Sequence, residues 1–88
     1  MNSVATRRFW ELFFALPADV QELAAKNYDL WRRDPRHPSL HFRRLQGSLD
    51  RFSVRVGEHY RALGKRTGDT MTWVWMGTHA EYDRLVGY

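Results

Sequence analysis

The feature that most constrains this fold is a series of three extended stretches in the second half of the chain, joined by two short turns. In the first stretch, residues 52–56, three apolar residues alternate with Ser53 and Arg55, the period expected of a strand with one buried face. Residues 57–59 and 67–69 each contain glycine and have the length and composition of hairpin turns. The segment therefore predicts three successive antiparallel strands with one apolar face.

The third of these stretches is the most apolar part of the predicted sheet. Met71, Trp73 and Trp75 would share one face, and Val74 and Met76 add apolar side chains to the other. This pattern predicts a central strand with both faces at least partly covered. It also assigns both tryptophans to the core.

Two more segments could extend the sheet. Residues 40–45 predict another strand, in which Leu40 and Phe42 would lie on one face and His41 and Arg43 on the other. The adjacent pair of arginines in this segment interrupts the alternation, as a β-bulge does. Residues 1–5 are compatible with a short edge strand, although no pattern requires one.

The first third of the chain is helical in pattern. Residues 6–16 place aromatic side chains on one helix face, with Thr6 as the N-cap; because this run is short, a strand is the alternative. A second helix is predicted from Pro17, which suits the first helical position, to Asp34, which precedes a proline. Residues 79–86 predict a short final helix.

These elements together predict a single α+β domain over residues 1–88. An N-terminal helical hairpin would pack on a small, twisted antiparallel sheet of 3–4 strands, with a short helix at the C-terminus. The second face of the sheet would then be free to carry Arg43, Arg55 and Arg61.

The distribution of charge narrows the class of partner. The net charge is +4, and residues 41–66 carry a local excess of +5, so the remainder of the chain is close to neutral. A one-sided basic surface indicates a polyanionic partner, either nucleic acid or an acidic protein, and a solvated face with scattered arginines is the alternative. The chain has no cysteine and its four histidines are scattered, so we predict neither a metal site nor another cofactor.

The N-terminal apolar run does not have the properties of a targeting segment. It is interrupted by Glu11 and followed directly by Pro17, without a small-residue cleavage pattern, and no stretch of the chain is long enough to span a bilayer. We therefore predict a cytoplasmic protein without membrane partners.

Three segments in this order resemble the RelE/ParE superfamily of bacterial type II toxins. They are NYDLWRRDPRHPSLHFRRL, FSVRVGEHYRALG and WVWMGTHAEYDRL, and the last resembles the ParE-like branch that ends in a Gly-(Thr/Ser)-His-x-x-Tyr-Asp signature. The resemblance implies a RelE/ParE-like fold and a small cytoplasmic toxin that is neutralised by a cognate antitoxin. In this superfamily the better-studied activity is metal-independent cleavage of mRNA, often on the ribosome, and a second branch poisons DNA gyrase.

The resemblance also implies the residues of a catalytic site. Arg55, Arg61 and His79 match the basic residues that RelE-like toxins use, and Tyr82 lies in the segment that supplies their aromatic residue. Tyr88, the last residue, is the competing candidate for that aromatic. The chain departs from the pattern at Ser53, where RelE-like toxins can carry a second lysine. Further contacts with RNA are expected from His41, Arg43, Arg44, His59 and Lys65.

Three classes of function remain open at this point. The first is an endoribonuclease, or mRNA interferase, in which two guanidiniums hold the phosphate and His79 transfers a proton. In this endoribonuclease, Tyr82 would stack on a base or assist the proton transfer. The second is a gyrase poison, which would not need His79. The third is a degenerate module that binds only its antitoxin or DNA.

Overall fold

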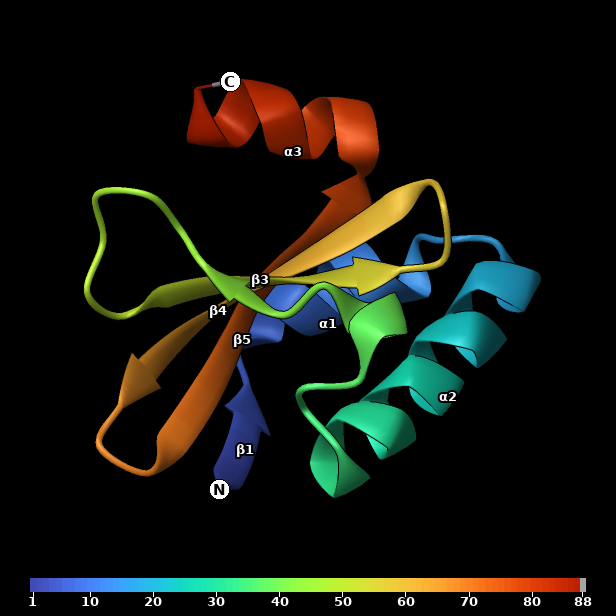
Figure 1. Cartoon of the computed structure of the whole chain (residues 1–88). Helices are drawn as coiled ribbons and strands as arrows, with labels where there is room; N and C mark the ends of the chain where they lie inside the picture. Colours follow the sequence, from blue (N-terminus) through green and yellow to red (C-terminus); the bar gives the residue numbers. More distant parts are fainter. Residues whose placement is uncertain (88) are drawn as a thin grey trace.

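The computed structural model describes residues 1–87, and Tyr88 lies outside the described residues. It contains two helices, a five-stranded sheet and a third helix at the C-terminal end (Figure 1). The elements in chain order are β1 (Asn2–Ala5), α1 (Arg7–Phe14), α2 (Ala18–Arg33), the 3-10 turn η1 (Pro38–Leu40), β2 (Arg43–Arg44), β3 (Arg51–Val56), β4 (Tyr60–Thr67), β5 (Thr70–Thr78) and α3 (His79–Val86).

The predicted α+β fold is confirmed, but its sheet is larger than expected. The strand order is β1-β5-β4-β3-β2, and the described sheet is mixed because β1 runs parallel to β5. The prediction of 3–4 antiparallel strands was therefore wrong in number and in the direction of one edge strand. Residues 1–5 had been the weakest strand signal, and β1 gains its partners from a segment about 70 positions away in the chain, between Thr70 and Trp73.

The helical hairpin forms as predicted. The Thr6 side chain accepts a hydrogen bond from the Phe9 amide at 3.1 Å and caps α1, so the alternative of a strand here was wrong. Pro17 is the N-cap of α2 rather than its first helical residue, and Asp34 is the C-cap. Asp34 precedes Pro35, and the residue before a proline is pushed out of the α region, which ends the helix there.

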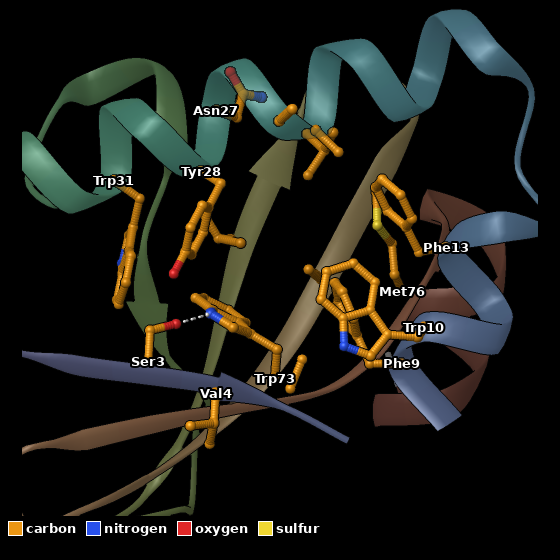
Figure 2. Close-up of a pocket in the computed structure, with 16 residues that line it drawn as sticks. Ser3, Val4, Phe9, Trp10, Phe13, Asn27, Tyr28, Trp31, Trp73 and Met76 are labelled. Carbon is orange, nitrogen blue, oxygen red and sulfur yellow. Dashed lines mark hydrogen bonds between the residues drawn. The ribbon is translucent and has the colours of Figure 1, made fainter. Parts of the chain in front are cut away.

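Helices α1 and α2 cover one face of the sheet and form the main core with it. Trp31 of α2 lies edge-on to Trp73 of β5, with ring centroids 5.1 Å apart. The Trp73 indole donates a hydrogen bond to the Ser3 hydroxyl at 3.0 Å, which attaches the edge strand β1 to this core. Between the helices and the sheet a largely apolar cavity of about 280 Å³ remains (Figure 2).

A β-bulge in β5 divides the aromatic residues of that strand between the two faces of the sheet. Leu63 pairs with Trp75 and Gly64 with Trp73, so Val74 has no partner on β4. Trp73 therefore belongs to the main core, whereas Trp75 packs on the opposite face with a second cluster formed by Leu45, Leu63 and Tyr82. The prediction that Met71, Trp73 and Trp75 share one face was wrong, because strict alternation does not survive an inserted residue.

The opposite face of the sheet is not free along its whole length. Helix α3 lies against β4 and β5 and covers the second cluster.

The predicted strand over residues 40–45 was largely wrong. Pro38 begins the turn η1, in which the ring of His37 accepts a hydrogen bond from the Ser39 amide at 3.2 Å. His41 then adopts a left-handed backbone conformation with φ 45, and only Arg43 and Arg44 pair with β3. Leu40, which is fully buried, enters the core from the turn instead of from a strand.

Within residues 1–87, no helix combines the length and the apolar character needed to cross a bilayer.

Candidate functional site

Two arginines lie directly opposite each other on adjacent strands. Arg55 of β3 and Arg61 of β4 are register partners on the face that α3 partly covers, and both are half-buried. Backbone carbonyls hold both guanidiniums: Arg55 Nε donates to the Gly57 carbonyl at 2.8 Å, and Arg61 Nη1 donates to the Tyr60 carbonyl at 3.3 Å. Like charges in this position repel each other, so the pair is a site of unbalanced positive charge.

The electrostatic environment of the pair affects the pKa of Arg61. Burial and the adjacent Arg55 lower the pKa of the Arg61 guanidinium, and Tyr82 and Asp83 act in the opposite direction. Within residues 1–87, neither arginine forms an ion pair with a carboxylate. An anion that entered between them would therefore relieve the repulsion, which is the condition for a phosphate-binding site.

His41 reaches this pair from the outer side of the sheet. Its Nε2 lies 3.4 Å from Arg55 Nη1. Loss of solvent around the ring, followed by the positive charges of Arg55, Arg43 and Arg61, lowers the pKa of His41. This shift favours the neutral form of the imidazole.

His79 reaches the site from the other side, as the first residue of α3. Its position is fixed because Thr78 and Glu81 form a capping box at the start of the helix and the His79 amide donates to the His59 carbonyl at 2.7 Å. Its Nδ1 lies 3.4 Å from Asp83 Oδ2, one helical turn along α3. Since Arg61 pairs with Gly77, His79 is two residues beyond the strand position opposite that arginine.

Tyr82 is buried beside the site. It is 6% exposed, belongs to the second apolar cluster, and has its ring centroid 6.4 Å from that of His79. Its ring therefore contributes to the packing under α3 whatever its part in chemistry. The competing Tyr88 lies outside the described residues.

The residues predicted to contact RNA are not gathered in one place. Arg43 pairs with Ser53 and lies on the face of the arginine pair, whereas Arg44 pairs with Phe52 and points to the opposite side of its strand. The exposed ring of His59 lies 3.9 Å from Glu58. Ser53, the position of departure from the RelE-like pattern, is buried and supplies no cation.

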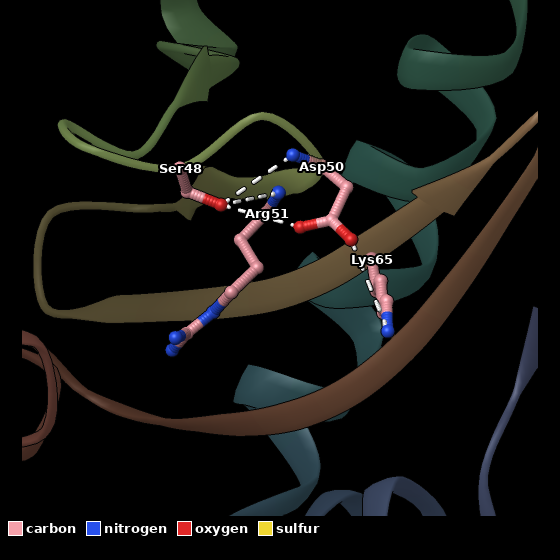
Figure 3. Close-up of polar contacts among 4 residues, drawn as sticks. All are labelled: Ser48, Asp50, Arg51 and Lys65. Atoms are coloured by element: carbon pink, nitrogen blue, oxygen red, sulfur yellow. Dashed lines mark hydrogen bonds and ion pairs between the residues drawn. The ribbon is translucent and has the colours of Figure 1, made fainter.

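Lys65 lies at the far end of the sheet from the arginine pair. It is four residues along β4 from Arg61, and its Nζ is 3.8 Å from Asp50 Oδ2 (Figure 3). Asp50 lies in a turn that Ser48 holds by accepting hydrogen bonds from two backbone amides. Within residues 1–87, no three His, Asp or Glu side chains come together in a group that could hold a metal ion.

The comparisons with known proteins concern the family and the fold. The family model of the ParE-like toxin domain matches residues 18–84, which include α2, strands β2 to β5, the arginine pair and most of α3. The chain belongs to this toxin family. The resemblance to the RelE/ParE superfamily is thereby confirmed. No curated protein sequence matches the chain.

Solved structures show the same fold at low sequence identity. A chain of the RelB–RelE antitoxin–toxin complex from Methanococcus jannaschii has a TM-score of 0.73 at 16% identity, with 92% of this chain and 96% of that chain covered. YafQ from E. coli has a TM-score of 0.73 at 14% identity, with the same shares of the two chains covered. A YoeB/ParE toxin from Agrobacterium tumefaciens has a TM-score of 0.69 at 18% identity, covering 90% of this chain and 99% of that chain.

Two features of the toxin's site were missed from the sequence. The contact between His79 and Asp83 could have been found, because residues four apart on a helix are neighbours. The contact of His41 with Arg55 had no such signal, since it depends on the left-handed backbone at His41.

Proposed function

We propose that this toxin is a metal-independent endoribonuclease that cleaves mRNA in the cytoplasm and thereby inhibits translation. The proposed substrate is single-stranded mRNA, free or bound to the ribosome. The toxin would be held inactive by a cognate antitoxin protein, as the RelE chains of related fold were crystallised with RelB.

The observation that carries this proposal is the uncompensated pair Arg55 and Arg61. These two arginines face each other, and within residues 1–87 their guanidiniums are anchored through backbone carbonyls and the imidazole of His41 and not through a carboxylate. Two fixed guanidiniums can bind a phosphodiester through several charge-assisted hydrogen bonds. They can also stabilise the charge that develops on the phosphorus oxygens in the transition state.

The remaining chemistry of RNA cleavage is proton transfer. The 2′-hydroxyl must lose a proton to attack phosphorus, and the leaving 5′-oxygen must gain one. His79 is a candidate for one of these steps, because an imidazole can give or accept a proton near neutral pH. Tyr82 is retained in the proposal as a neighbour of both Arg61 and His79 that can assist this transfer.

The test is growth after induced expression of the wild type, Arg61→Ala and His79→Ala, combined with primer extension on a reporter mRNA. The wild type should arrest growth and produce discrete new 5′ ends, and both variants should lose the ends. Arg33→Ala is a matched control, because this exposed arginine lies on α2, away from the pair, and should leave cleavage unchanged.

Two outcomes would contradict the proposal in different ways. Arrest without new 5′ ends, insensitive to His79→Ala, would favour poisoning of DNA gyrase, a binding activity that does not need the histidine. Absence of arrest in a strain without antitoxin, with folded protein present, would favour a module that binds only its antitoxin or DNA.

A further inference from the structure

We propose that RNA cleavage by this toxin uses two histidines on opposite sides of the arginine pair, with His41 as the general base and His79 as the general acid. This inference rests on the proposed ribonuclease function and adds a catalytic role for His41, which the sequence had suggested only as a contact for RNA.

The order of residues across the sheet supports this division. Arg43 pairs with Ser53 at the start of β2, and His41, two residues before it in the left-handed conformation, has its Nε2 3.4 Å from Arg55 Nη1. Arg55 pairs with Arg61 on β4, and Arg61 pairs with Gly77 on β5, so these residues form a row across the sheet. Two residues after Gly77 the chain enters α3 at His79. Adjacent strands are about 4.8 Å apart, so the Cα atoms of Arg55 and Gly77 are separated by about 10 Å.

This spacing suits the geometry of phosphoryl transfer. The attacking and leaving oxygens lie roughly in line on opposite sides of phosphorus. A phosphate held by both guanidiniums would therefore direct one of these oxygens towards each end of the row. One proton-transfer group is needed at each end; His41 contacts Arg55 at one end, and the chain reaches His79 two residues after Gly77 at the other.

The contacts of the two histidines distinguish their roles. A guanidinium can only donate hydrogen bonds, so the nitrogen that faces Arg55 must carry its lone pair. Loss of solvent at the ring, followed by the positive charges of Arg55, Arg43 and Arg61, also lowers the pKa of His41, which favours the unprotonated form of this nitrogen. His79 instead faces the carboxylate of Asp83 at 3.4 Å, a contact that is an ion pair when the imidazole is protonated.

The proposed step is balanced in atoms and electrons. The 2′-hydroxyl takes the place of Arg55 as the donor to His41 Nε2 and transfers its proton to that nitrogen. The 2′-oxygen then bonds to phosphorus, the bond from phosphorus to the 5′-oxygen breaks, and the 5′-oxygen takes the proton of His79. The products are a 2′,3′-cyclic phosphate and a free 5′-hydroxyl.

The backbone at His41 is consistent with a functional position. Within residues 1–87, His41 is the one residue other than glycine with a positive φ. Such conformations are uncommon for side chains other than Asn, Asp and His, and they concentrate at active sites. The conformation also makes Asn a suitable substitute, since Asn tolerates it and cannot accept a proton at neutral pH.

The decisive experiment compares two RNA oligonucleotides, tested free and as ribosome-bound mRNA. One has a normal phosphodiester, and the other has sulfur in place of the 5′-oxygen at the cleavage position. On the normal substrate, His41→Asn and His79→Asn should each lower kcat/KM about 10²- to 10⁴-fold, the usual contribution of one proton-transfer group. A thiolate leaves without protonation, because thiols have a pKa of about 8.5. The sulfur substrate should therefore restore cleavage by His79→Asn and not by His41→Asn.

Two further measurements separate chemistry from structure. The acidic limb of the wild-type profile of kcat/KM against pH should lie below pH 6.5 and disappear in His41→Asn, since the pKa of His41 is lowered. Added imidazole should restore part of the activity of His41→Gly. His37→Asn is the matched control, because an Asn side chain can still accept the hydrogen bond from the Ser39 amide and should leave the profile unchanged.

The outcomes distinguish this inference from the proposed function. If the wild type cleaves neither substrate, the ribonuclease function itself is wrong and the inference falls with it. If the wild type cleaves and His41→Asn is as active as the wild type, only the inference is overturned. Restoration of His41→Asn, and not of His79→Asn, by the sulfur substrate would also overturn it by reversing the two roles.

Discussion

Different interactions position the side chains on the two faces of the sheet. The face under α1 and α2 is organised by aromatic and sulfur-containing side chains such as Trp31, Trp73 and Met76, all nearly inaccessible to water. The opposite face has a smaller apolar cluster under α3, and beside it two arginines whose positions are set by strand register and backbone carbonyls. One face supplies stability through burial, and the other holds unbalanced charge that a polyanion can neutralise.

This contrast indicates that stability and activity are largely separable in this toxin. Apolar burial is the main favourable term in folding, and most of the buried apolar residues lie on the face under α1 and α2. The arginines contribute little to stability because their mutual repulsion opposes the gain from their hydrogen bonds. Substitutions on the two faces should therefore affect different measurements, and each prediction below tests that separation.

The largest expected effect is on stability. Trp31→Ala should lower the free energy of unfolding by about 3–5 kcal/mol, because it removes a buried aromatic side chain and leaves a cavity. Trp31→Phe should cost less, since the Trp31 indole nitrogen is buried without a hydrogen-bond partner among the described residues and phenylalanine has no such group. Urea unfolding of both variants measures the difference. If alanine and phenylalanine are equally costly, the cavity left by the missing ring is not the cause of the loss.

The next effect should be on activity alone. Arg61→Ala should reduce RNA cleavage about 10²- to 10³-fold, the range seen when one preorganised donor to a developing charge is removed. Its free energy of unfolding should change by no more than about 0.5 kcal/mol, as for other substitutions away from a packed core. Cleavage assays and urea unfolding on the same preparation test both parts. A loss of several kcal/mol would show that the arginine is structural and would remove the contrast between the faces.

The bulge gives a prediction of intermediate size. A Cβ added at Gly64 would lie 2.6 Å from Met71 Sδ and 2.9 Å from Trp73 Cε3. Gly64→Ala should therefore destabilise the toxin by about 1–3 kcal/mol, the usual cost of overpacking a core. The combination Gly64→Ala with Met71→Ala, measured by urea unfolding, should be less destabilising than the sum of the two single substitutions, because the smaller side chain removes the closest contact. Additive costs would show that the added methyl group is hindered by the rest of the strand and not by the Met71 side chain.

Local sequence patterns predicted those parts of the fold that depend on neighbouring residues. The caps at Thr6 and Asp34, the turn before Tyr60 and the short final helix each follow from residue types within one or two turns of chain. The arginine pair was also predictable, because a hairpin with a known turn fixes which residues of its two strands are opposite. Family resemblance then added His79 as a candidate without supplying its geometry.

The errors came from features that depend on distant parts of the chain. β1 is a strand because β5 offers it a parallel partner, and four residues in isolation carry too little signal to show this. The bulge at Val74 depends on pairing with β4, so the sequence of β5 alone predicted the wrong face for Trp75. The position of His41 depends on a left-handed residue after a 3-10 turn, a conformation that no periodic pattern indicates.

The smallest predicted effect concerns the helix that brings His79 to the site. The Thr78 amide and hydroxyl both donate hydrogen bonds to Glu81, at 2.9 Å each, and these bonds lower the pKa of Glu81. A carboxyl with a lowered folded-state pKa stabilises the fold above its unfolded pKa of about 4.5, and this contribution disappears as the pH falls through the folded-state pKa. Glu81→Gln should therefore lower stability at pH 7 by about 0.3–1 kcal/mol, the usual value of a negative charge at a helix N-terminus.

The pH dependence makes this prediction specific. The difference in unfolding free energy between wild type and Glu81→Gln should be constant from pH 7 down to about pH 5 and should shrink towards zero in more acidic buffer, because a protonated glutamate resembles glutamine. Glu22→Gln is the matched control: this exposed carboxyl on α2 has no hydrogen bond or ion pair within the described residues, so its substitution should have little effect at any pH. A difference at Glu81 that persists in acid would show that the cap acts through shape and not through charge. Loss of cleavage in Glu81→Gln beyond the loss of folded protein would show that α3 must be rigid for His79 to work, so that stability and activity are coupled on this face.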